Sequence, residues 1–466
     1  MPTHLTITQM AARIRSRELS PVELLDAHLK QIERWNPSLN AFVCVLAEEA
    51  RQAAREAEQR IMSRGPAGPL DGVPFTLKDS FDAAGLPTTC GSRFFAGLKA
   101  RHDSTVLRRM RQAGAILLGK TNTPEFLASY ETDNYITGRT NNPWDLSRTP
   151  GGSSGGEAAA IAAFLSPGGI GSDGGGSIRM PAHFTGIAGL KPTPGRISAD
   201  GHVPPMTHPA GMLGAAGPMA RTAEDVRILF RALAGYDYAD PFSSPGAIAD
   251  PLVDGLRIGL MEQFGTVPVQ PEIRETVRRA ASCLGDLGFV VEPFEPAGLE
   301  RAPNLWSFLF SDLPSRVTKE LIAGREQDAH WTGTEFLNRA LEKPEPTVLR
   351  VLDVLAERDR MRTGLLRRME QVPVLLTPAC GITAFRHRER RWSTGVKDIG
   401  LFEAVMPLTP SNLLGLPAMV IPFGMSAEGL PIGVQLVGRP YEEEVLLEIA
   451  VRMEEARGPF PGPKVF

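Results

Sequence analysis

The stretch from Gly151 to Gly176 constrains this chain more than any other part of it. Ten of its 26 residues are glycine. A glycine inside a helix or strand costs roughly 0.5–1 kcal/mol relative to alanine, so we expect a sharply bent or closely approached backbone instead of continuous regular structure. The hydroxyls beside these glycines, those of Ser153, Ser154 and Ser177, are therefore the first candidates for chemistry.

The spacing Gly169-x-Gly171-x-x-Gly174 matches the fingerprint of dinucleotide-binding folds. That fingerprint needs a strand before it, a helix after it and an acid about 20 residues later. Here a helix-like segment precedes the glycines, and the first acid after Asp173 is Asp200. A chance match within a glycine-rich run is the better explanation.

Gly151-x-Ser153-x-Gly155 matches the nucleophile elbow of α/β hydrolases. An elbow requires an apolar strand before the serine and a histidine elsewhere as the base. The preceding residues 147–150 are not apolar, and the eight histidines of the chain form no recognisable signature. The pattern favours a serine hydrolase whose base is not histidine.

A lysine can activate a serine hydroxyl if burial lowers the pKa of its amine toward neutrality. Lys78 follows the apolar run from Val73 to Leu77, which is expected to carry it into the interior. The alternative is that Lys78 is exposed and paired with Asp79. Judged from the residue types alone, this alternative is favoured. The run from Asp173 to Ser177 supplies the complement, since successive glycines free backbone N–H groups to form an oxyanion hole.

These segments together resemble the amidase signature family over most of the chain. The matching segments are Gly72-Val-Pro-Phe-Thr-Leu-Lys78-Asp79, Gly151-Gly-Ser-Ser-Gly-Gly-Glu157, Gly171-Ser-Asp-Gly-Gly-Gly-Ser-Ile-Arg179, Pro181-Ala182, Gly186 to Pro192, Gly217-Pro218, Gly415-Leu-Pro417 and Gly433-Val-Gln435. The resemblance implies an α/β fold, with one α/β/α layered domain around a large mixed β-sheet. It also implies a Ser-cis-Ser-Lys triad that needs neither a cofactor nor a metal.

Carried over by position, the resemblance implies that Ser177 is the nucleophile and Lys78 the base. Ser153, 24 residues before Ser177, is then the bridging serine that follows a cis peptide bond after Gly152. We expect Lys78, Ser153 and Ser177 to form one hydrogen-bonded chain.

The other site residues implied by the resemblance lie close to the two serines. Ser154 is expected to support Lys78 by hydrogen bonding, and Asp173 and Arg179 to form a structural pair that holds the loop. The oxyanion hole would consist of the backbone N–H groups of Gly174, Gly175, Gly176 and Ser177. Gly174 replaces what is often a larger residue in the family, so we expect extra room or flexibility there.

The implied function is a hydrolase of linear, non-peptide amide C–N bonds, with aryl esters and carbamates (urethanes) as further substrates. The alternative is the A-type component of a glutamyl-tRNA amidotransferase, which releases ammonia from glutamine. Met180 and the segment from Met212 to Ala216 depart from the pattern expected of that component. A hydrolase that acts without partner subunits is therefore the first expectation.

Composition narrows the class of partner. The formal net charge is −3 and the pI is near 6.3, which gives no electrostatic case for nucleic acid or an anionic membrane. The start of the chain resembles no secretory signal, and no stretch is long and apolar enough to span a membrane. We expect a cytoplasmic protein with a small-molecule substrate and reduced cysteines, and a homodimer remains open. The cysteines, which form no pairing motif, are Cys44, Cys90, Cys283 and Cys380.

The 466 residues are expected to form a single domain, because strands and helices alternate and no linker or repeat interrupts them. Residues 6–64 predict three helices, the second of which begins after Ser20 and ends at Asn36-Pro37. Residues 66–235 would form the core that carries the catalytic groups. Residues 297–400 predict a variable helical region whose aromatic residues shape the substrate pocket. Strands are predicted at 73–77, 115–118, 256–261, 289–294, 372–376, 418–423 and 432–437.

Overall fold

A single large β-sheet forms the centre of the computed structural model, which describes residues 1 to 464. Its strands are β1 (Phe42–Val45), β2 (Pro74–Lys78), β3 (Ile116–Thr121), β4 (Gly168–Asp173), β5 (Ala188–Lys191), β6 (Ala215–Ala220), β7 (Arg257–Leu260), β8 (Val290–Pro293), β9 (Val374–Pro378), β12 (Ala418–Met425) and β13 (Pro431–Val437). Within the described residues these 11 strands follow the order β1-β3-β2-β4-β6-β5-β12-β13-β9-β7-β8. A small separate sheet pairs β10 (Arg391–Ser393) with β11 (Asp398–Gly400).

The large sheet is mixed, as the sequence predicted. Strand β2 runs parallel to both β3 and β4, and β7 runs parallel to both β8 and β9. The strands between them, from β4 through β6, β5, β12 and β13 to β9, pair antiparallel, as β1 does with β3. Each predicted strand overlaps an observed one. Strands β1, β4, β5 and β6 were not predicted.

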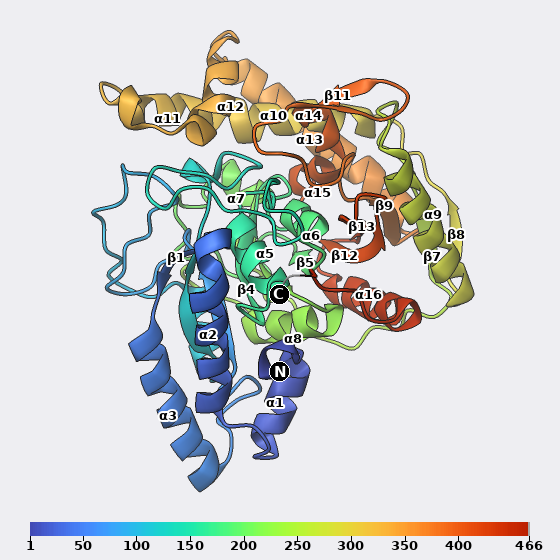
Figure 1. The fold of residues 1–466 in the computed structure, drawn as a ribbon. Coiled ribbons are helices and arrows are strands. Elements are labelled where there is room, and N and C mark those ends of the chain that lie inside the picture. The colour runs from blue at the N-terminus through green and yellow to red at the C-terminus, as the bar shows by residue number, and fades with distance from the viewer. Residues whose placement is uncertain (465–466) are drawn as a thin grey trace.

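Helices surround the sheet, on both of its faces and over one end (Figure 1). They are α1 (Ile7–Arg15), α2 (Pro21–Leu39), α3 (Ala47–Arg64), α4 (Thr105–Gln112), α5 (Gly155–Ala162), α6 (Arg179–Thr185), α7 (Ala210–Leu213), α8 (Ala223–Leu233), α9 (Pro271–Asp286), α10 (Ala302–Ser307), α11 (Leu313–Ile322), α12 (Trp331–Leu341), α13 (Val348–Met369), α14 (Leu401–Ala404), α15 (Thr409–Leu413) and α16 (Glu443–Arg457). Short 3₁₀ or π turns lie at η1 (Pro2–His4), η2 (Glu125–Leu127), η3 (Leu299–Arg301), η4 (Phe308–Asp312), η5 (Glu326–Asp328) and η6 (Met406–Leu408).

Strand β4 shows how the layers are arranged, because successive residues of a strand face opposite sides of the sheet. The Cα–H of Gly168 points toward α1 and α8, where Ile7 and Leu229 lie next to it. Gly169 and Gly171 instead point toward α5 and the residue before it, Ser154. Helices α1 and α8 therefore cover one face and α5 the other, which is the α/β/α layering that the sequence predicted.

The N-terminal segment contains the three predicted helices, α1 to α3, with the unpredicted strand β1 between the last two. Ser20 caps α2 by accepting hydrogen bonds from the N–H groups of Val22 and Glu23 at 3.0 and 3.3 Å. The helix was expected to end at Asn36-Pro37. It instead continues through Pro37 for one more turn. It ends at Asn40, whose left-handed backbone (φ 53°) makes the C-cap.

The glycine-rich stretch contains more regular structure than the sequence predicted. Residues Gly168–Asp173 form the buried strand β4, and Gly155 and Gly156 begin helix α5. The glycines are needed because these elements lie in direct contact: a Cβ on Gly169 would lie 2.5 Å from the Thr76 carbonyl oxygen and would also collide with Glu157. The entropic cost of glycine is therefore offset by close packing of α5 on the sheet.

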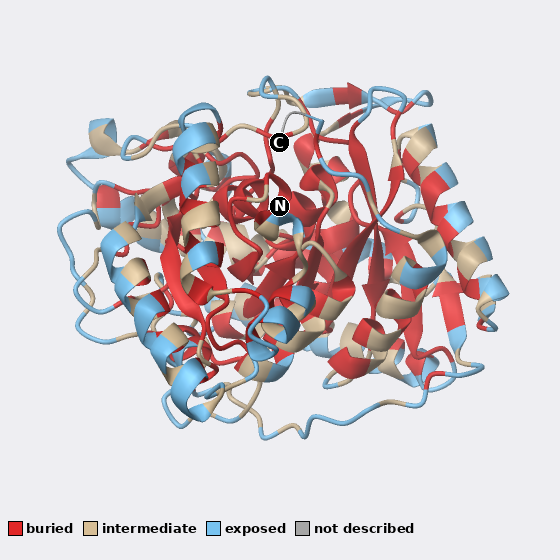
Figure 2. Cartoon of the chain, turned by 60° about the horizontal axis from the view of Figure 1, so that its bottom comes forward, coloured by how far each residue is buried: buried red, intermediate tan, exposed pale blue. Residues whose placement is uncertain are grey.

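Helices α10 to α14 form a cap over one end of the sheet, at the top of Figure 1. Buried residues are concentrated in the sheet and the helices against it, whereas the outer helices alternate buried and exposed faces (Figure 2). Across residues 1–464, no helix combines the length and apolar character needed to cross a membrane.

We predict that Gly169→Ala destabilises the protein by about 1–3 kcal/mol, because the added methyl group must displace both the backbone of β2 and the Glu157 carboxylate. Gly364→Ala on α13 is the matched control: nothing lies within 4 Å of its added carbon, and alanine should stabilise that helix by up to about 1 kcal/mol. Urea unfolding of both variants measures the difference. A Gly169→Ala protein as stable as the wild type would contradict the packing argument.

Candidate active site

Lys78 is the last residue of strand β2 and is fully buried. Its neighbour Asp79 points away from it and forms a buried ion pair with Lys120 at 2.7 Å. The exposed Lys78–Asp79 pair that the sequence left open is therefore not formed. Lys78 has no carboxylate partner among the described residues.

The Lys78 amine contacts two serines. Its Nζ lies 2.7 Å from Ser153 Oγ, 3.0 Å from Ser172 Oγ and 3.3 Å from the Ser172 carbonyl oxygen. Burial disfavours the charged form of an amine, and it lowers the pKa of Lys78 to about 7. An appreciable fraction of Lys78 is therefore neutral near neutral pH and can accept a proton.

Ser153 lies just before helix α5, and the peptide bond between Gly152 and Ser153 is cis. Its side chain is buried against Lys78. Gly152 leaves no room for a side chain, because a Cβ there would lie 2.5 Å from the carbonyl oxygen of Ser129. The next residue, Ser154, donates its N–H to the Ser177 carbonyl oxygen at 3.1 Å, which ties the two serine segments together.

Ser177 precedes helix α6 and is partly exposed, unlike Ser153. In the described part of the chain, no hydrogen bond joins the Ser153 and Ser177 hydroxyls. The expected chain of three residues is therefore formed only between Lys78 and Ser153. Within residues 1–464 the Ser177 hydroxyl makes no bond that would fix its rotamer, which leaves it free to turn toward a bound molecule.

Two aromatic side chains hold the glycine run before Ser177 by its carbonyl groups. Trp306 donates its indole N–H to the Gly174 oxygen at 2.8 Å, and Tyr130 donates its hydroxyl to the Gly175 oxygen at 2.7 Å. Phe310 stacks on Trp306 with ring centroids 5.1 Å apart. It fills the expected extra room at Gly174, where an added Cβ would collide with the ring.

The four expected oxyanion donors are not equivalent. The Gly176 N–H already donates to the Asp173 carboxylate at 2.7 Å. The N–H groups of Gly174, Gly175 and Ser177 have no acceptor within residues 1–464. Three of the four donors are thus available to a developing negative charge.

Asp173 and Arg179 form the expected pair, which is fully buried, with two N–H···O contacts of 2.9 Å. Burial alone would raise the pKa of Asp173, but the Arg179 charge and hydrogen bonds outweigh it and hold that pKa well below its usual value. The remaining Arg179 bonds go to the residues Leu408, Ser411, Asn412 and Gln435. The pair therefore anchors the glycine loop to the segment of η6 and α15 and to strand β13.

The structure differs from one expectation about the lysine. Ser154 does not bond to Lys78; its hydroxyl points toward the Ser172 carbonyl oxygen at 3.4 Å. Ser172 holds the amine instead, because it lies near the end of strand β4, beside the end of the parallel strand β2. Ser172 could not be identified from the sequence, because β4 was not predicted as a strand and its pairing with β2 was therefore not expected. For Trp306, the sequence contained only a weak indication of a role at the site, namely its place among the aromatic residues of 297–400.

The part of the chain that the structure describes contains no cluster of three or more His, Cys, Asp or Glu side chains able to hold a metal ion. His183 lies near Ser177 in sequence, but both ring nitrogens contact backbone groups of Gly433 and Ile382. It is a structural histidine.

Comparison with known proteins gives consistent results. Residues 23–447 match a family model described as Amidase. The A component of the glutamyl-tRNA(Gln) amidotransferase from Methylococcus capsulatus is 36% identical, with 97% of this chain and 96% of that protein covered.

Two solved structures are similar along the whole chain. A 6-aminohexanoate cyclic dimer hydrolase complexed with substrate has a TM-score of 0.88 and 32% identity, covering 100% of this chain and 99% of the other. A protein from a vestigial complex that reveals the origins of an s-triazine catabolic enzyme has a TM-score of 0.91 and 29% identity, covering 98% and 100%.

We predict that Arg179→Met destabilises the fold by about 3–5 kcal/mol at pH 7, because it leaves the Asp173 carboxylate buried and unpaired. The folded-state pKa of Asp173 is depressed, so the pair stabilises the protein above the unfolded aspartate pKa of about 3.9 and loses that contribution as the pH falls. The gap between variant and wild type in urea unfolding should therefore narrow below about pH 4. A gap that is independent of pH would argue against this role.

Proposed function

The chain belongs to the amidase family and is an enzyme that hydrolyses C–N bonds, and from this premise we propose that it cleaves a carboxylic amide through an acyl-enzyme on Ser177. The observation that carries the proposal is the contact between Lys78 and Ser153, at 2.7 Å, in a site where burial lowers the pKa of the lysine to about 7. A base near neutral pKa beside a serine is what acyl transfer requires.

In the proposed acylation step, neutral Lys78 accepts the proton of Ser153 while Ser153 accepts the proton of Ser177. The Ser177 oxygen forms a bond to the amide carbon, and the carbonyl electrons move onto its oxygen. The N–H groups of Gly174, Gly175 and Ser177 stabilise this oxyanion, since they have no other acceptor in the described chain. The Gly176 N–H acts indirectly, by holding the loop to Asp173.

The second half of the reaction uses the same groups in reverse. Lys78 returns its proton through Ser153 to the leaving nitrogen, and the C–N bond breaks to release the amine. Water then attacks the acyl group, giving up one proton to the relay, and the Ser177 oxygen leaves with that proton. Esters and carbamates fit this scheme, because they differ only in the leaving group.

The sequence relatives favour glutamine as the amide. The A component of the glutamyl-tRNA(Gln) amidotransferase from Methylococcus capsulatus is 36% identical over nearly the whole chain. This similarity supports the amidotransferase alternative more strongly than the departures at Met180 and Met212 to Ala216 argue against it. In this assignment the chain releases ammonia from glutamine for an assembly with partner subunits.

A hydrolase of small amides without partner subunits is the second candidate. The rings of Trp306 and Phe310 lie directly against Gly174 and Gly175, so an apolar wall borders the oxyanion donors. Such a wall suits an apolar acyl or aryl group better than the charged backbone of glutamine. The similarity to a cyclic dimer hydrolase also supports this candidate.

We predict that a fluorophosphonate probe labels the wild-type protein on Ser177 and that Ser177→Ala abolishes both labelling and amide turnover. Ser393→Ala, which removes an exposed serine on β10, is the control and should be labelled like the wild type. Mass spectrometry of the labelled peptide identifies the site. Undiminished turnover by Ser177→Ala would rule out the proposed nucleophile.

The rate constant kcat/KM should rise with pH and level off above an inflection near 7, because only neutral Lys78 accepts a proton. Lys78→Ala should lose about 10²–10⁴-fold in kcat/KM, the usual contribution of a general base. Lys191 is the matched control, since burial also lowers its pKa to about 7, yet within the described chain its amine bonds to the Pro192 carbonyl group and to no serine. If Lys191→Met removed the inflection and Lys78→Ala kept it, the assignment of the base would be wrong.

One panel of substrates separates the two candidates. Purified protein is assayed with L-glutamine, aryl amides of increasing acyl size, esters and carbamates, with Ser177→Ala as the blank for each. Glutaminase activity that depends on co-purified partner proteins supports the amidotransferase assignment. Efficient hydrolysis of aryl amides by the isolated chain supports the second candidate.

A further inference from the structure

His202 is buried and reaches the lysine network from a loop that the sequence motifs do not include. Its Nε2 lies 2.9 Å from Ser172 Oγ, the same hydroxyl that contacts Lys78 Nζ at 3.0 Å. Its Nδ1 lies 2.8 Å from the carbonyl oxygen of Pro204. The ring therefore stands at the end of a line that runs through Ser172 and Lys78 to Ser153.

The hydrogen positions along this line follow from its end. A carbonyl oxygen can only accept, so His202 Nδ1 carries a hydrogen and donates it to Pro204. Burial lowers the pKa of His202 to about 3, so the ring is neutral and Nε2 accepts. The Ser172 hydroxyl must then donate to His202, which leaves its lone pairs for Lys78.

This arrangement orients the amine. A neutral lysine amine carries two hydrogens and one lone pair. Both hydrogens have acceptors on Ser172, the hydroxyl at 3.0 Å and the carbonyl oxygen at 3.3 Å. The lone pair is then left for the Ser153 hydroxyl at 2.7 Å. Without His202, the Ser172 hydroxyl could turn and donate to that lone pair instead.

The His202 loop is attached to the strand end that carries Lys78. The Val203 N–H donates to the Ser80 carbonyl oxygen at 2.7 Å, and the Asp82 N–H donates to the Gly201 oxygen at 2.8 Å. The His202 ring meets Phe81 edge-on, with centroids 4.9 Å apart. These contacts fix the ring relative to Lys78.

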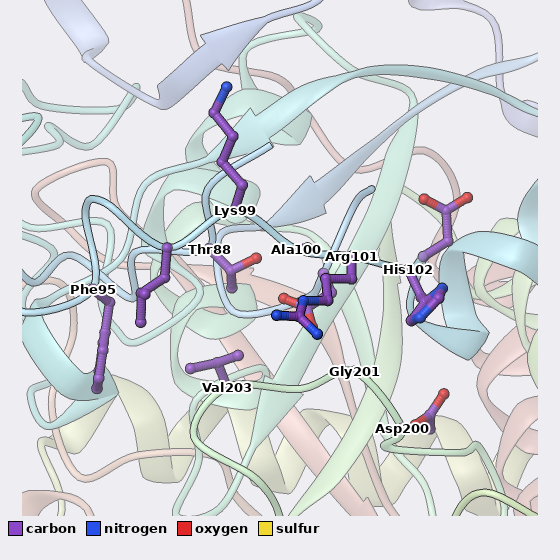
Figure 3. Close-up of a pocket in the computed structure, with 12 residues that line it drawn as sticks. Thr88, Phe95, Lys99, Ala100, Arg101, His102, Asp200, Gly201 and Val203 are labelled. Atoms are coloured by element: carbon purple, nitrogen blue, oxygen red, sulfur yellow. The ribbon is translucent and has the colours of Figure 1, made fainter. Parts of the chain in front are cut away.

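The outer side of the same loop is open. Gly201 and Val203 line a surface cavity of about 400 Å³, together with Thr88 and Asp200 (Figure 3). The cavity contains none of the three proposed catalytic residues. The His202 side chain thus points inward from the wall of a cavity that is separate from the reaction site.

On the basis of the function proposed above, we propose that His202 is a positioning residue, which acts through Ser172 to direct the lone pair of Lys78 toward Ser153. It touches neither the substrate nor Ser177 in this role. Its effect should appear in the rate of proton removal and not in substrate binding.

The test compares His202→Leu, which removes the acceptor, with His202→Gln, whose amide oxygen can still accept from Ser172. The readout is the rate constant for fluorophosphonate labelling of Ser177, together with kcat and KM for the best amide of the panel. His202→Leu should lower the labelling rate constant and kcat about tenfold, the effect of one lost hydrogen bond, with KM unchanged. His202→Gln should stay within about threefold of the wild type. His202→Met replaces the leucine variant if that one does not fold.

A double-mutant cycle with Ser172→Ala separates positioning from structure. His202→Leu should change the labelling rate less than about twofold when Ser172 is already alanine, because its effect passes through that hydroxyl. An equal loss in both backgrounds, or an equal loss for leucine and glutamine, overturns the inference. If the wild type is labelled and His202→Leu matches it, only this inference fails; if Ser177 of the wild type is not labelled, the proposed function fails first.

Discussion

The burial of the Lys78 amine without a carboxylate partner in the described chain is the constraint on which the site depends. Taking an ammonium group out of water is expensive, and the neighbouring Asp79 cannot compensate because it faces the other side of the sheet and pairs with Lys120. The amine therefore approaches neutrality near pH 7. What remains around it are hydroxyl groups, from Ser153 and Ser172, which can exchange protons with it without holding it charged.

The second charged group of the site, the Asp173–Arg179 pair, is buried with its charges fully paired and has a structural role. Arg179 and Asp173 neutralise each other in the interior and bind backbone groups of the glycine loop, so the loop keeps its shape although its residues have no side chains. Trp306 and Tyr130 hold the carbonyl groups of the same loop. With the carbonyl oxygens anchored by these side chains, the N–H groups of Gly174 and Gly175, which have no acceptor within residues 1–464, are left for a ligand.

Much of the fold could be predicted from the sequence, but not the strands at its centre. Apolar runs predicted β2, β3, β7, β8, β9, β12 and β13, because alternating or continuous hydrophobicity records burial. Strands β4, β5 and β6 consist mainly of glycine and alanine and give no such pattern. Their glycines allow close approach to different neighbours: Gly169 to α5 and the β2 backbone, Gly189 to α6, and Gly217 to the β5 backbone. These contacts are set by the packing of the elements, which a single segment of sequence does not record. The sequence motifs also favoured a hydrolase without partner subunits, whereas the relatives support the amidotransferase alternative better.

The sequence by itself determined the family and the mixed α/β fold, and it singled out Lys78, Ser153, Ser177 and the glycine run as the proposed site, because these residues stand in contiguous motifs. Only the tertiary structure decided which hydroxyl supports the lysine, which N–H groups are free and which aromatic rings border them. Ser172, His202 and Trp306 act through contacts across 30 to 132 residues of chain. Such contacts follow from strand pairing and packing in three dimensions, which leave no local pattern in the sequence.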